Sequence, residues 1–499
     1  MVHQPKALSV LFFTELWERF SFYGMKALLI FYLTKYYLFS DNFAAEIIGN
    51  YAALVYAIPI IGGYIADKYI GHIQAVIIGA IFLTIGHLGM AIEGTPAYTE
   101  NASIVRDNNG VQLFFLSMSF IIAGVGLLKA NISTLVGALY NKDDGRRDSG
   151  FTLFYMGINL GSAMATFICG YIGETYGWSY GFGLAGLGMI SGLITFLIGK
   201  NRLVQGIVIN KELESQKFST KTIITIIGSL FSVIIFWILV QNHKIVGQLL
   251  VLSLLSFIAF TLYYIVKLAT TLERGKIFVL LILTLSSIVF WSIFEQEFIS
   301  MNLFADRLVD REIFGATIKA STLLTLNPIF IILLAPIIAT LWNTLALRNA
   351  DPSPTIKFAF GLIFAGLASA LLVAGCYFMN EEMKVHLIWL ILAYLFLTIG
   401  EICLSPVGLS AVTKLSPTRI TGVMMGGWFL ATAGSEYLAA VFSKIASVDN
   451  LVDSNNYTLL ANQYKYLFSI LASMGILTGI ILLLMNPLLS KIMNDKKIN

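Results

Sequence analysis

Four ionisable side chains lie close together near the start of the chain: Glu15, Glu18, Arg19 and Lys26. The residues around them are apolar, and a charge in the bilayer interior costs at least a few kcal/mol, so such groups usually line a solvated path. At about 100° per residue, these side chains and Tyr23 fall within an arc of roughly 140° on one helix face. Glu15 can neutralise Arg19 four residues later, which leaves the Glu18 carboxylate free to exchange a proton. The pattern indicates machinery that couples proton movement to another process.

The composition is that of a membrane protein. Of the 499 residues, 57% are hydrophobic and 12% are charged, whereas about 25% are charged in ordinary soluble domains. The hydrophobic runs are about 20 to 30 residues long, which is enough for a helix to cross roughly 30 Å of hydrocarbon and unlike the alternating ten-residue signature of a β-barrel. The formal net charge of +4 comes from basic residues in short loops, so we interpret it as an orientation signal and expect no nucleic-acid partner.

The elements that must position the charges are about fourteen transmembrane helices, which makes the chain an all-α polytopic membrane protein. The predicted spans are Ala7–Leu38, Ala44–Lys68, Ile73–Glu93, Val111–Tyr140, Ser149–Tyr176, Trp178–Lys200, Thr222–Gln241, Ile245–Lys267, Ile277–Phe304, Ile313–Asn343, Thr355–Met379, Val385–Thr413, Thr421–Phe442 and Leu459–Leu489. An even number of spans places both termini on one side of the membrane. Basic residues are roughly twice as frequent in the loops on that side, which predicts a multi-pass protein of the plasma (inner) membrane with both termini cytoplasmic.

The seventh and eighth spans differ from the others. They follow the longest predicted cytoplasmic loop, Asn201 to Lys221, and carry no acidic or basic side chain inside the membrane before Lys267, apart from the loop residues between them. They resemble a lipid-facing insert between two six-helix halves, a design in which the substrate site lies near the midplane between the halves. The predicted domains are therefore an N-terminal six-helix bundle (1–200), a cytoplasmic loop with a two-helix insert (201–274) and a C-terminal six-helix bundle (275–499).

Two stretches resemble signatures of the proton-dependent oligopeptide transporter (POT) family of the major facilitator superfamily. Residues 15–24 are similar to the ExxERFxYY signature of helix 1, and residues 154–162 look like the signature of helix 5. Shorter similar stretches lie at residues 128–131, 294–296, 326–328 and 400–406. The resemblance covers essentially the whole chain and implies the major facilitator fold, with two six-helix bundles and a two-helix insert.

A site that accepts many short peptides must hold the two charged termini and tolerate variable side chains. The basic residues Arg19, Lys26 and Lys129 are expected to meet the peptide carboxylate, and Glu401, with Asn159 and Asn327, the amino group. We expect amphipathic walls from Tyr23, Tyr56, Trp291 and Trp428, although packing between helices is an equally good interpretation of each aromatic residue. The predicted substrate-binding set is Tyr23, Lys26, Tyr56, Lys129, Asn159, Trp291, Glu295, Asn327, Glu401, Ser405 and Trp428.

The resemblance implies that Glu295 couples transport to protons, because the family places there a carboxylate that alternates between protonation and a salt bridge to a basic residue of helix 1. That basic residue is Lys26 here. Protonation of the acid weakens the pair, so proton occupancy biases which side of the transporter is open. Glu15, Glu18 and Arg19 complete the predicted proton-coupling set, and the alternative is a buried pair that only fixes helix packing.

Three departures from the signatures bear on the substrate. Phe22 stands where the family has its first tyrosine, and Lys26 replaces the commoner arginine and loses its bidentate geometry. Glu297 is about 200° from Glu295 on an ideal helix, so both carboxylates can face one cavity only if the helix is distorted.

These observations predict a proton-coupled symporter that imports di- and tripeptides by alternating access. The alternative keeps the fold but carries another small solute, such as nitrate or an amino-acid-like compound. The sequence contains no Walker loop, no His-Glu-x-x-His motif and no Gly-x-Ser-x-Gly elbow, so we expect neither an enzyme nor a metal or organic cofactor, and the proton gradient is the expected energy source. The expected partners are peptides, protons and membrane lipids, and we expect the chain to function as a monomer.

Overall fold

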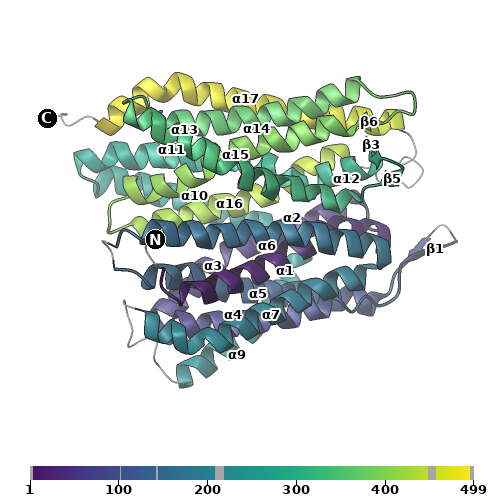
Figure 1. Ribbon diagram of the computed structural model, residues 1–499, viewed down its shortest axis with the longest axis horizontal. Helices are drawn as coiled ribbons and strands as arrows, with labels where there is room; N and C mark the ends of the chain where they lie inside the picture. The colour runs from purple at the N-terminus through teal and green to yellow at the C-terminus, as the bar shows by residue number, and fades with distance from the viewer. Residues whose placement is uncertain (1–3, 102, 142–143, 208–218, 448–456, 495–499) are drawn as a thin grey trace. The chain divides into compact units, whose positions relative to one another are not determined.

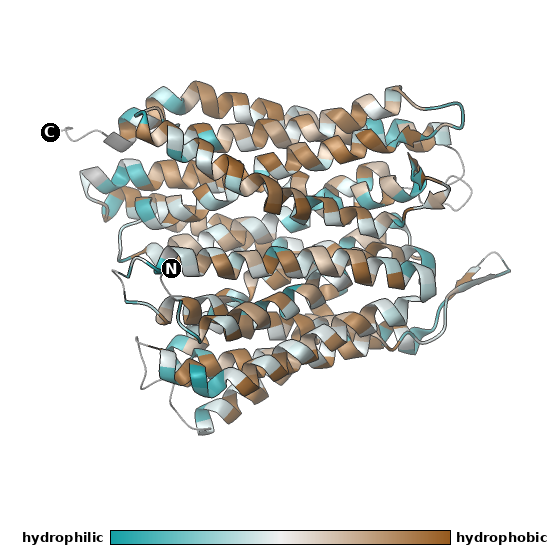
Figure 2. Ribbon diagram, in the orientation of Figure 1, coloured by the Kyte–Doolittle hydropathy of each residue, from teal (hydrophilic) through white to brown (hydrophobic). Residues whose placement is uncertain are grey.

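The computed structural model describes residues 4–101, 103–141, 144–207, 219–447 and 457–494, and it is almost entirely helical (Figure 1). Twelve helices in this part of the chain are long and apolar enough to cross a membrane. Helix α1 (Leu8–Phe31) is not among them, because it carries the charge cluster. Figure 2 shows hydrophobic residues along the helices and hydrophilic residues concentrated toward their ends and in the connecting segments. The predicted all-α, polytopic membrane class is confirmed.

The contacts divide the chain into two compact units. The first unit contains Met1–Phe39, Asn50–His243 and Ile318–Pro328, and the second contains Ser40–Gly49, Lys244–Thr317 and Ile329–Asn499. Helix α2 (Asp41–Ala57) contributes its first residues to the second unit and the remainder to the first.

The first unit packs its long helices side by side. Its elements are α1, the π-helical turn η1 (Tyr32–Tyr36), α3 (Pro59–Ile65), the π-helical turn η2 (Ala66–Ile70), α4 (His72–Met90), the hairpin β1–β2 (Tyr98–Glu100 and Ser103–Val105), α5 (Asn108–Ala138), α6 (Arg147–Tyr176), α7 (Trp178–Gly206), α9 (Thr220–Val240) and the 3-10 turn η4 (Ala320–Thr325). The most extensive contacts join α4 to α5 and α1 to α6 and α7.

The second unit has the same helical character. Its elements are α10 (His243–Lys267) from Lys244 on, α11 (Thr271–Phe294), the 3-10 turn η3 (Glu295–Phe298), α12 (Ser300–Arg307), the short strands β3 (Val309–Asp310), β4 (Glu312–Ile313), β5 (Ala316–Thr317) and β6 (Val385–His386), α13 (Leu326–Leu347) from Ile329 on, α14 (Pro354–Tyr377), α15 (Leu387–Leu415), α16 (Thr421–Ser443), the 3-10 turn η5 (Lys444–Ala446) and α17 (Tyr457–Asn494). Here α14 contacts both α15 and α17, and α11 contacts α16.

Local chemistry explains where several helices begin. The Asp107 carboxylate accepts hydrogen bonds from the backbone N–H groups of Asn109 and Gly110, both at 3.1 Å, and so caps α5. These backbone donors hold the pKa of Asp107 below its ordinary value. Helix α14 begins with Ser353 as the cap and Pro354 at the first position, where the missing N–H of proline costs nothing.

The helix boundaries depart from the prediction in one notable place. The predicted span Ile313–Asn343 begins in a hairpin in which β4 pairs with β5. A 3-10 turn starts at Ala320, and helix α13 begins only at Leu326. Phe314 and Gly315 both have positive φ, at 50° and 79°. Two such residues in succession make the tight turn that joins antiparallel strands, and a right-handed helix cannot include them.

The two predicted insert helices belong to different units. Helix α9 contacts α5 in the first unit, whereas α10 packs on α16 in the second, where a Cβ on Gly427 would lie 2.0 Å from the Phe257 ring. The domain boundaries derived from the sequence remain a prediction.

Candidate substrate and proton site

The charges of α1 form one buried cluster in the first unit. The Arg19 Nε atom donates to Glu18 and lies 3.1 Å from Glu15 Oε1. The three residues are exposed by only 4%, 1% and 4% for Glu15, Glu18 and Arg19. One oxygen of each carboxylate and one nitrogen of the guanidinium, Arg19 Nη2, make no hydrogen bond within the described residues. Two acids therefore share one guanidinium and still have acceptor capacity for a proton.

Two lysines extend this cluster. Lys129 on α5 interacts electrostatically with Glu15, and its Nζ lies 3.7 Å from the centroid of the Tyr56 ring on α2. Lys26 is only 1% exposed, and its Nζ lies 5.9 Å from the Phe22 ring. The structure thus brings Glu15 of the predicted proton-coupling set together with Lys129 and Tyr56 of the predicted substrate-binding set, from three helices.

Phe22 has a role that the sequence comparison did not reveal. Its buried ring lies near two cations. The Arg19 guanidinium is 5.2 Å and the Lys26 Nζ atom 5.9 Å from the ring centroid. It also stacks on Tyr51 with a centroid distance of 6.5 Å and contacts Tyr23 edge-on. Loss of the signature hydroxyl therefore leaves an aromatic face that stabilises both basic residues.

The first unit also contains both predicted asparagines. Asn159 on α6 donates to the Tyr155 carbonyl at 3.1 Å, and Asn327 lies in the segment Ile318–Pro328. The hydroxyls of Thr166 and Thr325 meet at 2.9 Å, which fixes that segment on α6. Because Thr166 is seven residues after Asn159, both lie on the same face of α6.

In the second unit, Glu295 begins a distorted stretch of helix. α11 gives way to the 3-10 turn Glu295–Phe298, followed by Ile299 at φ −122° and ψ −91°. Residues two apart lie about 160° from each other on an α-helix but about 120° apart on a 3-10 helix. The helix is therefore distorted at Glu295 and Glu297, which is the condition under which both carboxylates could face one cavity. Both are buried, and Glu297 interacts electrostatically with Tyr394 on α15.

Gln296 holds this turn in place. Its side-chain amide donates to the Ser292 and Ala439 carbonyls at 3.1 and 2.9 Å, and it accepts from the Ser300 hydroxyl. These three hydrogen bonds tie η3 to α11, α16 and α12 and fix the backbone that carries the two acids.

The remaining predicted residues lie on α11, α15 and α16 of the second unit. Glu401 and Ser405 are half-buried and one turn apart on α15, which contains Pro406 in its interior. Trp291 is half-buried, and its indole Nε1 has no hydrogen-bond partner within the described residues. Trp428 is buried against Phe358 and Gly408, where a Cβ on the glycine would lie 2.1 Å from the indole. This environment agrees with packing, one of the two interpretations left open.

Two ion pairs of the second unit hold the start of α2 and were not predicted from the sequence. Arg307 donates two hydrogen bonds to the Asp41 carboxylate, at 2.6 and 2.7 Å. Lys444 pairs with Glu46 at 2.5 Å, and a Cβ on Gly49 would lie 2.5 Å from Ala440. The only signal in the sequence was an acid in the first turn of a predicted span.

A buried network in the first unit was also missed. The His72 ring contacts the Asn131 amide oxygen at 2.8 Å, and the amide nitrogen donates to the Leu127 and Gly62 carbonyls at 2.7 and 3.3 Å. His72 also lies 3.3 Å from Asp67. These bonds connect α3, α4 and α5.

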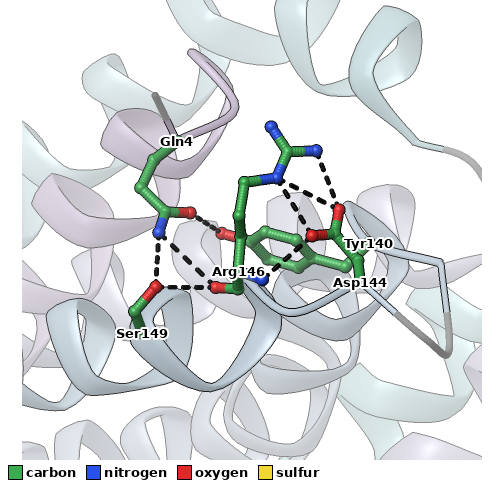
Figure 3. A network of polar contacts seen from close by, with 5 residues as sticks. All are labelled: Gln4, Tyr140, Asp144, Arg146 and Ser149. Carbon is green, nitrogen blue, oxygen red and sulfur yellow. Dashed lines mark hydrogen bonds and ion pairs between the residues drawn. The ribbon is translucent and has the colours of Figure 1, made fainter. Parts of the chain in front are cut away.

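A third network fixes the N-terminal segment (Figure 3). Gln4 donates to Ser149 at 2.6 Å and accepts from the Tyr140 hydroxyl at 2.7 Å. Arg146 donates to Asp144 through its backbone and its guanidinium, which lowers the pKa of Asp144 to about 2.

Comparison with known proteins decides the family. The family model described as POT family matches residues 73–460. The chain belongs to the POT family. The peptide transporter YePEPT of Yersinia enterocolitica is 34% identical, over 90% of this chain and 89% of that protein. The di-/tripeptide transporter of Lactococcus lactis strain IL1403 is 34% identical, over 99% and 97%. A solved peptide transporter POT in complex with sulfate has a TM-score of 0.82 and 33% identity, covering 98% of this chain and 96% of its own.

The two signature stretches of the POT family lie on helices that pack closely against each other. They lie on α1 and α6, which touch: a Cβ on Gly161 would lie 2.3 Å from the Leu16 carbonyl and 3.2 Å from the Arg19 Cβ. A Cβ on Gly24 would lie 2.7 Å from the Cys169 sulfur. Glycine is needed where the POT charge cluster on α1 packs against α6.

Proposed function

We propose that this chain is a proton-coupled symporter that imports di- and tripeptides by alternating access. The observation that carries the proposal is the group formed by buried Glu15, Glu18 and Arg19 with half-buried Lys129, in which charges of both signs lie inside mainly apolar helices. Such groups are costly in a membrane unless they line a functional, hydrated path. The names of the relatives support peptides as the cargo.

In this proposal the two units supply opposite charges to a peptide. Arg19, Lys26 and Lys129 attract its carboxylate from the first unit, and Glu401 attracts its amino group from the second. Glu295 exchanges the coupled proton and, when ionised, pairs with Lys26 in one state of the cycle. Both residues are buried, so each pays a desolvation penalty that a partner or a proton relieves.

The proposal extends to the setting of the protein. It works as a monomer in the plasma membrane with both termini in the cytoplasm, takes its energy from the proton gradient and needs no cofactor. It catalyses no chemical reaction on its cargo.

The decisive experiment uses proteoliposomes with an imposed inward proton gradient. The wild-type chain should accumulate a labelled dipeptide, and Glu295→Gln should lose gradient-driven accumulation while it retains exchange of dipeptide across the membrane. Glu312→Gln, which removes an exposed carboxylate on β4, is the matched control and should accumulate normally. Unchanged accumulation by Glu295→Gln would overturn the coupling role.

A competition assay tests the cargo. Di- and tripeptides should compete with the labelled dipeptide, and nitrate should not. Glu401→Gln should weaken binding of peptides with a free amino terminus more than binding of their N-acetylated forms. An equal loss for both forms would count against the role of Glu401.

A further inference from the structure

A large groove lies within the first unit, away from the charge cluster. Its volume is about 640 Å³, and it is lined by α3, η2, α5 and α9. The walls are mainly aliphatic and aromatic, with Ile58 and Ile61 on one side and Ile235 and Phe236 on the other. The lining residues include no acidic side chain. These walls suit a hydrocarbon chain rather than a charged peptide.

One face of α9 lines one side of the groove. The eight α9 residues that line it, Lys221, Ile224, Thr225, Gly228, Ser229, Ser232, Ile235 and Phe236, fall within an arc of about 140°. Three of the central positions are glycine or serine. A Cβ on Gly228 would meet no atom within 4 Å. Small residues at the centre of this face therefore leave space that a larger side chain could fill.

The opposite wall is closed by backbone contact. A Cβ on Gly62 of α3 would lie 1.9 Å from the Gly126 carbonyl of α5. α9 is anchored beside this wall, because Thr222 donates to Gln74 of α4 at 2.6 Å and Val233 and Val240 are buried. The groove is consequently a fixed feature between packed helices, and not a gap beside a loosely attached one.

The groove has a basic end and is long enough to hold a lipid acyl chain. Lys221 is its one lining residue with a charge, and it stands in the first turn of α9, at the end predicted to be cytoplasmic. From Lys221 to Phe236 the helix rises about 22 Å, since fifteen steps of about 1.5 Å separate them. One leaflet of the hydrocarbon core is about 15 Å deep, half of the total of roughly 30 Å.

We propose that this groove binds one phospholipid of the cytoplasmic leaflet, with an acyl chain beside Gly228 and an anionic headgroup at Lys221. The charge of Lys221 is complementary to a lipid phosphate, and the adjacent apolar walls continue into the membrane-facing surface of α9. The site is separate from the peptide site, so the proposal does not depend on the transport function.

Native mass spectrometry of the purified full-length chain tests the proposal. With phosphatidylglycerol as the probe, the wild type should retain one tightly bound lipid. Gly228→Trp fills the groove and should reduce its occupancy at least about fivefold. Leu230→Trp is the matched control, because Leu230 is 45% exposed and lies about 200° around α9 from Gly228. Equal retention by the two variants would overturn the proposal.

Two further variants test the acyl-chain contact and the headgroup contact separately, and a check of folding accompanies them. Ser229→Leu is a milder block and should also reduce retention, and size-exclusion chromatography checks that each variant is monodisperse. Lys221→Gln should reduce the preference for phosphatidylglycerol over phosphatidylcholine about fivefold, the ratio that corresponds to about 1 kcal/mol per basic residue. If inorganic phosphate displaces the lipid from the wild type, the acyl chain contributes nothing and the proposal fails.

Discussion

The Nζ atom of Lys129 lies over the ring of Tyr56, 3.7 Å from its centroid. The contact joins α5 to α2 and places the lysine where it also interacts with Glu15. The ring attracts the lysine cation through its negative face and so helps to position the ammonium group.

Tyr56 should therefore contribute through its ring. Tyr56→Phe should bind a dipeptide within about twofold of the wild type, whereas Tyr56→Leu should bind about fivefold more weakly, the equivalent of about 1 kcal/mol. Competition against a labelled dipeptide measures both. If the phenylalanine variant binds as weakly as the leucine variant, the hydroxyl carries the interaction instead.

Arg19 should be essential for stability because it neutralises two buried acids. Arg19→Gln should lower the free energy of unfolding by about 3 kcal/mol, since it removes the cation that pairs with both buried carboxylates. Denaturant unfolding in detergent measures this, with Arg202→Gln on the exposed end of α7 as the control. The triple variant that adds Glu15→Gln and Glu18→Gln should regain part of the loss. No regain would mean that the arginine acts by packing alone.

The pair between Asp41 and Arg307 should stabilise the second unit. Asp41→Asn removes the charge but keeps the shape of the side chain, and it should lower the free energy of unfolding by on the order of 2 kcal/mol. The loss is smaller than for a fully buried pair because both side chains keep some exposure. The same unfolding assay applies. Asp306→Asn, which breaks the weaker contact with Arg311 at 3.1 Å, is the control and should cost less.

Asp144 should have no influence on the pH profile of uptake. Arg146 lowers its pKa from 3.8 to about 2, so any stability from the pair is present above pH 3.8 and is lost only as the pH falls toward 2. Between about pH 5 and about pH 8, Asp144→Asn should reproduce the wild-type profile, because the carboxylate is ionised throughout this range. A shifted profile for Asp144→Asn would connect the network of Figure 3 to the coupled proton.

Gly161 should tolerate no side chain. Gly161→Ala places a methyl group 2.3 Å from the Leu16 carbonyl, so α1 and α6 must separate at a cost of about 1 to 3 kcal/mol. Gly434→Ala on α16 meets no atom within 4 Å and should be neutral or slightly stabilising. Thermal unfolding compares the two, and equal midpoints would contradict the close approach of these helices.

The sequence by itself determined the membrane class, the order of the helical spans and the charged face of α1. These properties depend on the hydropathy of continuous segments and on spacing along one helix, which follow from a rise and rotation that every α-helix shares. The family signatures were visible for the same reason, because each is a short local motif.

Only the tertiary structure decided which helices meet. Nothing in the spacing of residues could pair Arg307 with Asp41, 266 positions away, or stack Phe22 of α1 on Tyr51 of α2. The 3-10 turn at Glu295 and the hairpin at Phe314 override local helical periodicity. Contacts of this kind depend on how side chains of separate helices fit together, and the period of a single helix contains no information about that fit.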